Sequence, residues 1–388
     1  MATTITWDLR EQAPALLASL GERLGFDLGA ELADITRQLP IMASFRPMQA
    51  APFVRLHGHQ RAFYKTLAPS GVLAFKGTEL EVGDLDRAFK ELSDDRLPNR
   101  RSVLEHFVIS EQKLPMALVH DEAIAEATNA CAFQQAYVAR YRELARVPLS
   151  LLVLRWSDED VAAFERRLVP LLSRRAAAIA RSLFERGLGV YVYYYPELPE
   201  RLAQQHLTAA GPCVDHRGFQ ARYEALARRR DPKQVIGDWV RLFVRMLGLG
   251  YLPCNLAHIG IGQCVDPNNA IMDGGFADLD SLQRIADIPD NAQFYETLAY
   301  SLASLASVIQ GLLVGSTKLQ FHSGVEPLSS LPIHVACVKA GQMIEGERAN
   351  GTEFDPRVLD FFAREDPLES LIVLCREILR PFDVASHI

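Results

Sequence analysis

The sequence has few cysteines, and they are far apart. Six cysteines are spread over 388 residues, at positions 131, 213, 254, 264, 337 and 375. No C-x-x-C pair occurs, which argues against a zinc knuckle or a redox dithiol. We therefore expect reduced, buried thiols and a cytoplasmic location.

The chain also lacks an excess of positive charge and a long apolar run. Its 41 Lys and Arg residues against 48 Asp and Glu give a net charge of −7, so no overall field attracts nucleic acid or an anionic membrane. Residues 1–10 lack the basic and apolar pattern of a signal peptide. The uncharged stretches 246–265 and 297–317 carry polar residues and fit interior segments better than membrane spans. We expect no nucleic-acid partner and no membrane.

The composition is that of a globular protein, with 49% hydrophobic and 23% charged residues. Its length is enough for two domains or one bilobal unit. Residues 1–157 contain a predicted helix over 1–45, β-prone runs at 52–60, 71–80, 115–120 and 147–156, and helices at 84–95 and 101–112. Residues 158–388 read as mainly helical, with helices at 158–186, 198–208, 216–230, 233–248, 291–315 and 355–380. The tyrosine-rich run 191–195 interrupts them as a strand with its hydroxyls in water. The predicted class is α+β, with a small mixed lobe (1–157) and a larger, mainly helical lobe (158–388).

The segment 260–280 is the richest in chemistry. It reads GIGQCVDPNNAIMDGGFADLD, in which turn-forming residues separate several carboxylate and amide oxygens. We expect a hairpin that brings Asn269 and Asp278 together at one end. Mg²⁺ prefers such oxygens and needs only one or two protein ligands when phosphates supply others. The alternative is a polar surface hairpin, and the spacing does not fit a calcium loop of the EF-hand type.

A second signal is the lysine that ends a predicted strand. In the run 71–79, alternation places Val72, Ala74 and Lys76 on one face. Such a lysine can contact a phosphate if a carboxylate orients it, and Glu105 or Glu111 on the next predicted helix is placed to do so. The alternative is a strand-end lysine in solvent.

The order of these signals resembles the protein-kinase-like superfamily. A strand lysine, Lys76, precedes a helix glutamate, Glu105, an apolar helix at 235–247, and a hairpin from Asn269 to Asp278. The resemblance extends over about residues 55–315, and within the superfamily it is closest to the selenoprotein O type of pseudokinase, which transfers AMP to protein hydroxyls. It implies a bilobal kinase-like fold, with Lys76 on the phosphates, Glu105 orienting Lys76, and Asn269 and Asp278 holding Mg²⁺.

The motifs that carry the resemblance are Phe75-Lys76-Gly77, the run RSVLEHFVISE at 101–111, and the nine-residue step from Asn269 to Asp278. The sequence departs from the pattern in four places. No Gly-rich loop precedes the lysine, Cys264 stands where a catalytic Asp is expected, Asp278-Leu279-Asp280 replaces D-F-G, and the C-terminus has no redox cysteine. Asp266 is the carboxylate available to orient an acceptor.

These features predict an ATP- and Mg²⁺-dependent transferase. It would move phosphate or AMP onto a hydroxyl or amine of a small molecule or peptide, with Asp266 as its catalytic residue. One alternative is an inactive kinase-like scaffold that binds a nucleotide or a peptide. Another is a kinase-fold enzyme with altered chemistry in peptide or natural-product modification.

Overall fold

The computed structural model forms two compact units. The sheet unit comprises Met1–Gln135, Pro148–Leu198 and Thr208–Gln220, and the helical unit comprises Ala136–Val147, Pro199–Leu207 and Ala221–Ile388. The strand at 188–195, which was expected in the larger lobe, pairs within the sheet and so belongs to the sheet unit. The described residues are 4–18, 29–30, 32–33, 53–54, 62–66, 71–77, 108–109, 112–114, 117–196, 231–256, 264–266, 269–314 and 330–363.

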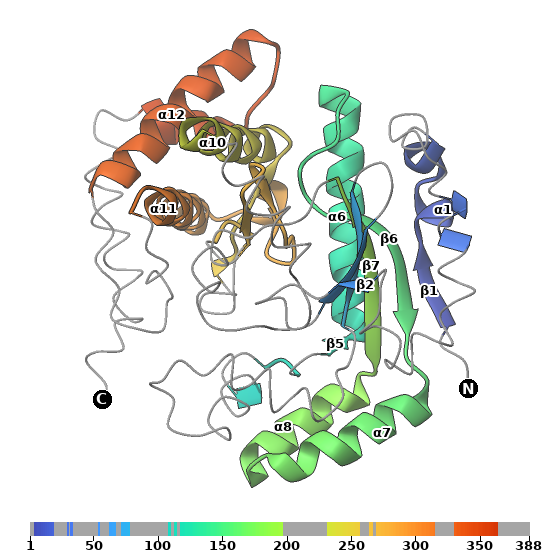
Figure 1. Ribbon diagram of the computed structural model, residues 1–388. Coiled ribbons are helices and arrows are strands. Elements are labelled where there is room, and N and C mark those ends of the chain that lie inside the picture. Colours follow the sequence, from blue (N-terminus) through green and yellow to red (C-terminus); the bar gives the residue numbers. More distant parts are fainter. Residues whose placement is uncertain are drawn as a thin grey trace. The chain divides into compact units, whose positions relative to one another are not determined.

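The sheet unit is built on a seven-stranded antiparallel sheet (Figure 1). Its strand order is β1-β6-β7-β4-β3-β2, and β5 pairs with β7. The β-prone runs of the sequence each contain a strand, as predicted. The strands are β1 (Thr4–Asp8), β2 (Phe53–Val54), β3 (Ala62–Thr66), β4 (Val72–Lys76), β5 (Leu118–Val119), β6 (Leu149–Arg155) and β7 (Leu188–Tyr195).

Two local expectations for this unit are wrong. The first is the start of the predicted helix 1–45, because residues 4–8 form a strand that pairs with β6. Among the described residues of that range, Leu9–Gln12 (α1), capped by Asp8, and residues 14–18, 29–30 and 32–33 are helical, as predicted. The β-branched and aromatic residues of Thr4–Asp8 favour a strand once a partner strand is present. The tyrosine side chains of β7 do not reach water either, since every residue of this strand is buried.

The helices of the sheet unit include one that the sequence did not reveal. The long helix α6 (His120–Tyr141) begins in this unit and lies along β6 and β7 (Figure 1). The predicted helix 158–186 is two helices, α7 (Asp158–Leu168) and α8 (Arg174–Glu185), joined by the 3-10 turn Val169–Leu171. Ser157 caps α7 by accepting from the Asp160 N–H, as its acidic first turn indicated. The helices predicted at 84–95, 101–112, 198–208 and 216–230 lie wholly or largely outside the described residues.

The helical unit packs three helices together and carries two small antiparallel ladders. Apolar side chains of α10 and α11 form its core, including Trp239, Phe243, Leu298 and Leu302. The described helices are α10 (Pro232–Gly248), α11 (Asn291–Val314), α12 (Ser330–Ala349) and α13 (Pro356–Ala363). The ladders are β8 (Tyr251–Leu252) with β11 (Gln283–Arg284), and β9 (Ala270–Ile271) with β10 (Gly275–Phe276), and the 3-10 turn Ile285–Asp287 follows β11.

The described part of the chain is therefore α+β, as predicted. In that part, each helix is too short or too polar to traverse a bilayer.

Candidate functional site

Lys76 forms a buried ion pair with a helix glutamate. The lysine ends β4, and its Nζ lies 2.9 Å from Oε1 and 2.8 Å from Oε2 of Glu126 on α6. The side chains are only 9% and 4% exposed. A charge-assisted contact to both carboxylate oxygens in a dry environment fixes the direction of the ammonium group.

The strands hold the glutamate in place through the residue next to it. The Ser150 hydroxyl on β6 donates to the carbonyl oxygen of Ala127 at 2.8 Å. The Tyr191 hydroxyl on β7 lies 2.8 Å from the same serine oxygen, and since Ser150 has one hydroxyl hydrogen, Tyr191 is the donor. Tyr191 is the cross-strand partner of Lys76. The lysine, its helix partner and the two strands thus form one connected, buried arrangement.

The carboxylate that pairs with Lys76, that of Glu126, was not among the residues expected from the sequence. Glu105 and Glu111, the two residues expected there, lie outside the described residues. Glu126 escaped notice because α6 is rich in alanine and small residues and shows no clear apolar stripe. The sequence does contain a signal for this role, because Glu126 is an isolated acid between two alanines of a helical run. In the structure, Ala123, Ala127 and Ala130 of that run are fully buried.

The hairpin expected around Asn269 and Asp278 is confirmed. Ala270 pairs with Phe276 and Ile271 with Gly275, so the turn lies at Met272–Gly274. Beyond the ladder, the Ala277 N–H donates to the carbonyl oxygen of Asn269 at 2.7 Å. Asn269 and Asp278 consequently lie at the same, open end of the hairpin.

Asp266 lies just before this hairpin and is tied to it. Its carbonyl oxygen accepts from the N–H groups of Asn269 at 2.8 Å and Ala270 at 2.7 Å. Asp266, Asn269 and Asp278 are 4%, 7% and 8% exposed. All three polar side chains are therefore almost completely withdrawn from water.

The loop that leads to Asp266 is anchored by one serine. The Ser281 hydroxyl accepts from the Cys264 N–H at 2.6 Å and donates to the carbonyl oxygen of Pro253 at 3.0 Å. Both contacts are buried. Ser281 thus joins the segments before and after the hairpin and fixes the start of the Cys264–Asp266 loop.

The neighbouring aspartates, Asp273 and Asp280, have local roles in the backbone. The Asp273 carboxylate accepts from the Gly275 N–H at 2.9 Å, at the turn end of the hairpin and away from Asn269. The Asp280 N–H donates to Oδ1 of Asp278 at 3.4 Å. Asp273 is therefore a turn residue, and Asp280 supports the loop that carries Asp278.

The residue in the position of an expected catalytic aspartate is a protonated thiol. Cys264 is fully buried, and burial raises the pKa of its thiol well above the ordinary value, with Cys254 and the carboxylates of Asp278 and Asp280 acting in the same direction. A thiol in this state is neutral near pH 7. Cys264 therefore does not serve as a general base, and Asp266 is the carboxylate nearest to it along the described loop.

The side chains of Asn269 and Asp278 suit a hard cation whose remaining ligands come from a bound molecule and water. Asn269 and Asp278 offer one amide and one carboxylate, which are oxygen ligands of the kind that Mg²⁺ prefers. Within the described ranges no three His, Cys, Asp or Glu side chains are grouped as a self-sufficient metal site. Magnesium here would need further oxygens from phosphates and water, as is usual for its nucleotide sites.

Comparison with known proteins gives no family for this chain. No family model, curated protein or solved structure matches it. The site is therefore argued from its own residues.

Proposed function

We propose that this protein is an ATP- and Mg²⁺-dependent transferase. It moves phosphate or AMP to a hydroxyl or amine of a small molecule or peptide. The observation that carries the proposal is the buried ion pair of Lys76 with Glu126. A strand lysine held by a helix glutamate is the arrangement that positions nucleotide phosphates in protein kinases.

The order of the strands around Lys76 supports the same proposal. Counting from β2, the lysine lies on the third strand of an antiparallel series, β2, β3 and β4. The helix with Glu126 follows it along the chain, and β6 and β7 come next. This matches the kinase order of a third-strand lysine followed by a helix glutamate. A kinase-like fold, with a sheet lobe and a helical lobe, belongs to this proposal.

Each residue has a defined role in the proposed reaction. Lys76, oriented by Glu126, binds phosphate oxygens. Asn269 and Asp278 hold Mg²⁺, which when bound neutralises phosphate charge. Asp266 orients the acceptor hydroxyl or amine and accepts its proton. Such transfers depend mainly on positioning and charge neutralisation. A carboxylate two residues beyond the expected catalytic position, Asp266, is therefore sufficient for the acceptor.

The second candidate is a nucleotide-binding scaffold without turnover. It is favoured by one observation, the neutral buried thiol of Cys264 where a catalytic aspartate is expected. The two candidates share the binding site and differ only in whether ATP is consumed.

The binding part is tested by thermal unfolding with ATP, Mg²⁺ or both. At a hundredfold excess over Kd, binding stabilises the folded state by about 2.7 kcal/mol. We expect this only when both are present. Glu126→Gln and Asp278→Asn should abolish the effect. Their matched controls, Asp121→Asn at the exposed start of α6 and the exposed Asp287→Asn, should leave it unchanged.

The transfer is tested by the nucleotide product formed with a mixture of amino acids and peptides as acceptors. Phosphoryl transfer breaks the bond between the β- and γ-phosphates and releases ADP, whereas AMP transfer releases pyrophosphate. Either product, lost in Asp266→Asn, supports the enzyme. Mg²⁺-dependent binding with neither product supports the scaffold, and absence of any binding overturns both.

A further inference from the structure

The turn of the β9–β10 hairpin is held against α10 in an arrangement that only glycine permits. Gly274 has a φ of +91°, and a Cβ at this position would overlap the Cβ of Asp238. The Trp239 indole N–H, one residue along α10, donates to the carbonyl oxygen of Ile271 at 2.9 Å. The turn end of the hairpin therefore lies directly on one turn of helix α10.

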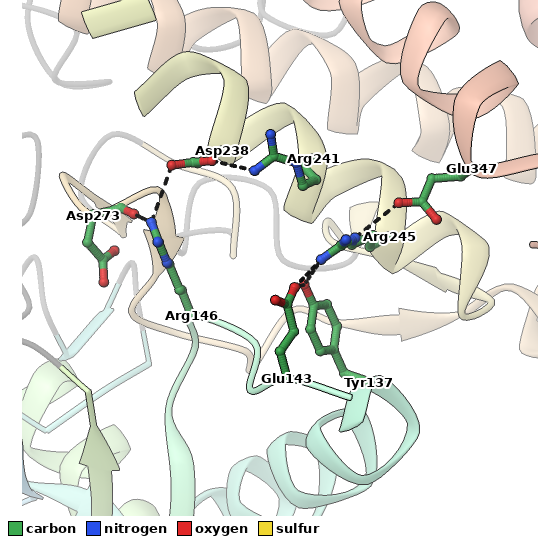
Figure 2. Close-up of polar contacts among 8 residues, drawn as sticks. All are labelled: Tyr137, Glu143, Arg146, Asp238, Arg241, Arg245, Asp273 and Glu347. Carbon is green, nitrogen blue, oxygen red and sulfur yellow. Dashed lines mark hydrogen bonds and ion pairs between the residues drawn. The ribbon is translucent and has the colours of Figure 1, made fainter. Parts of the chain in front are cut away.

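Arg146 contacts this hairpin with both its backbone and its side chain. Its carbonyl oxygen accepts from the Phe276 N–H at 3.0 Å. Its guanidinium Nη1 donates to the carbonyl oxygen of Asp273, as Figure 2 shows. The same Nη1 lies 3.3 Å from the Asp238 carboxylate. One residue thus joins both sides of the hairpin turn to the helix beneath it.

The other arginine on Asp238 lies on α10 and, among the described residues, forms its bond within that helix. Arg241 donates to the Asp238 carboxylate at 2.6 Å from the next turn of α10 (Figure 2). Its side chain is 51% exposed, and that of Arg146 is 46% exposed. The two arginines therefore share a partner and a degree of exposure, and differ in the bond to Asp273.

We propose that Arg146 is a positioning residue of the Asn269 and Asp278 metal site. This inference rests on the proposed function. The ladder has only two residue pairs, so the orientation of its open end depends on how its turn end is held as well as on the backbone bonds to Asp266. By securing the turn at Asp273 and Phe276, Arg146 sets the direction in which the hairpin presents Asn269 and Asp278. It acts through the backbone and does not touch the metal.

The test compares Arg146→Ala with Arg241→Ala in the full-length protein. The first measurement is the Mg²⁺ concentration that gives half-maximal binding of ATP. Loss of residues that support metal ligands typically costs 10–100-fold in metal affinity, so we expect R146A to raise this concentration by about tenfold or more. R241A should raise it less than twofold.

A second measurement does not depend on nucleotide. Amide hydrogen exchange of the 270–280 segment reports how firmly the hairpin is held. We expect faster exchange in R146A and no change in R241A, with the same exchange in α11 in all three proteins. The inference is overturned if R146A and R241A show equal amide exchange. It is also overturned if the original protein binds ATP with Mg²⁺ and the two variants need the same Mg²⁺ concentration for half-maximal binding. If the unchanged protein shows no Mg²⁺-dependent binding, the proposed function fails, and the metal role of Arg146 fails with it, even where the exchange result stands.

Discussion

Lys76 and Glu126 are charged partners that are both almost completely withdrawn from water. Two contacts of 2.8 and 2.9 Å join them. Desolvation of two such charges is expensive, and it is balanced by attraction only while both partners are present. A buried pair of this kind is a weak source of stability. What the pair does in the fold is hold the lysine ammonium in one direction.

The ion pair predicts a non-additive pattern of stability. Lys76→Met and Glu126→Leu should each lower the free energy of unfolding by about 3–5 kcal/mol, since each leaves one buried charge alone. The double variant K76M/E126L should lie within about 1 kcal/mol of the original protein. Urea unfolding measures all three. Arg186→Gln is the control, because it removes an exposed ion pair to the same helix and should cost less than about 1 kcal/mol.

All three ion-pair variants should lose Mg²⁺-dependent ATP binding, including the double variant whose stability recovers. This separation of stability from binding distinguishes a phosphate-binding lysine from a purely structural one. Additive losses of stability, or ATP binding retained by K76M/E126L, would contradict the role given to the pair.

Ser150 is predicted to couple helix α6 to the strands. Ser150→Ala removes the donor to Ala127 and the acceptor for Tyr191, and should lower the free energy of unfolding by about 1–3 kcal/mol. In a double-mutant cycle with Tyr191→Phe, the combined loss should be smaller than the sum of the single losses. The control is Ser182→Ala, whose exposed hydroxyl bonds only within its own helix. It should stay within about 0.5 kcal/mol of the original protein, and an equal effect of S150A and S182A would count against the coupling.

Two glycines, one in the hairpin turn and one in the adjacent helix, should respond oppositely to alanine. Gly274→Ala is expected to cost at least about 1–3 kcal/mol, because its positive φ and the overlap with Asp238 both oppose a side chain. Gly237→Ala, inside α10 with open space where a Cβ would lie, should stabilise by about 0.5–1 kcal/mol. Urea unfolding of the two variants, with ATP binding measured beside it, is the check. A neutral or stabilising G274A would show that the turn does not lie against Asp238.

The buried Cys254 thiol predicts a loss of stability in alkali. Burial raises its pKa from about 9 to about 12. Between these values the unfolded chain has released the thiol proton and the folded chain has not, so stability falls as the pH rises above 9. The loss from this one group approaches about 1.4 kcal/mol per pH unit. Urea unfolding at pH 8, 9, 10 and 11 should show a shallower decline in Cys254→Ala, and an identical decline would refute the assignment.

The most local parts of the structure were accessible from the sequence. The Asn269–Asp278 hairpin could be predicted because turn formers separate two short β-prone runs at a spacing that allows one register. The helix start at Ser157 and the strand ending at Lys76 follow the same kind of rule, since capping and alternation act over a few residues. Outside the site, the prediction of a helix from residue 1 was wrong for Thr4–Asp8, because this segment becomes a strand only through its pairing with β6.

Sequence alone determined the α+β class, the end of the Lys76 strand and the placement of Asn269 and Asp278 at one end of a hairpin, since each depends on neighbours a few residues away. Only the tertiary structure decided which carboxylate meets Lys76. Glu126 is 50 residues further along the chain, on an alanine-rich helix that is stabilised by packing against β6 and β7. The same holds for Arg146, which reaches Asp273 across 127 residues. Contacts between residues so far apart depend on how the whole chain packs, and no local pattern encodes them.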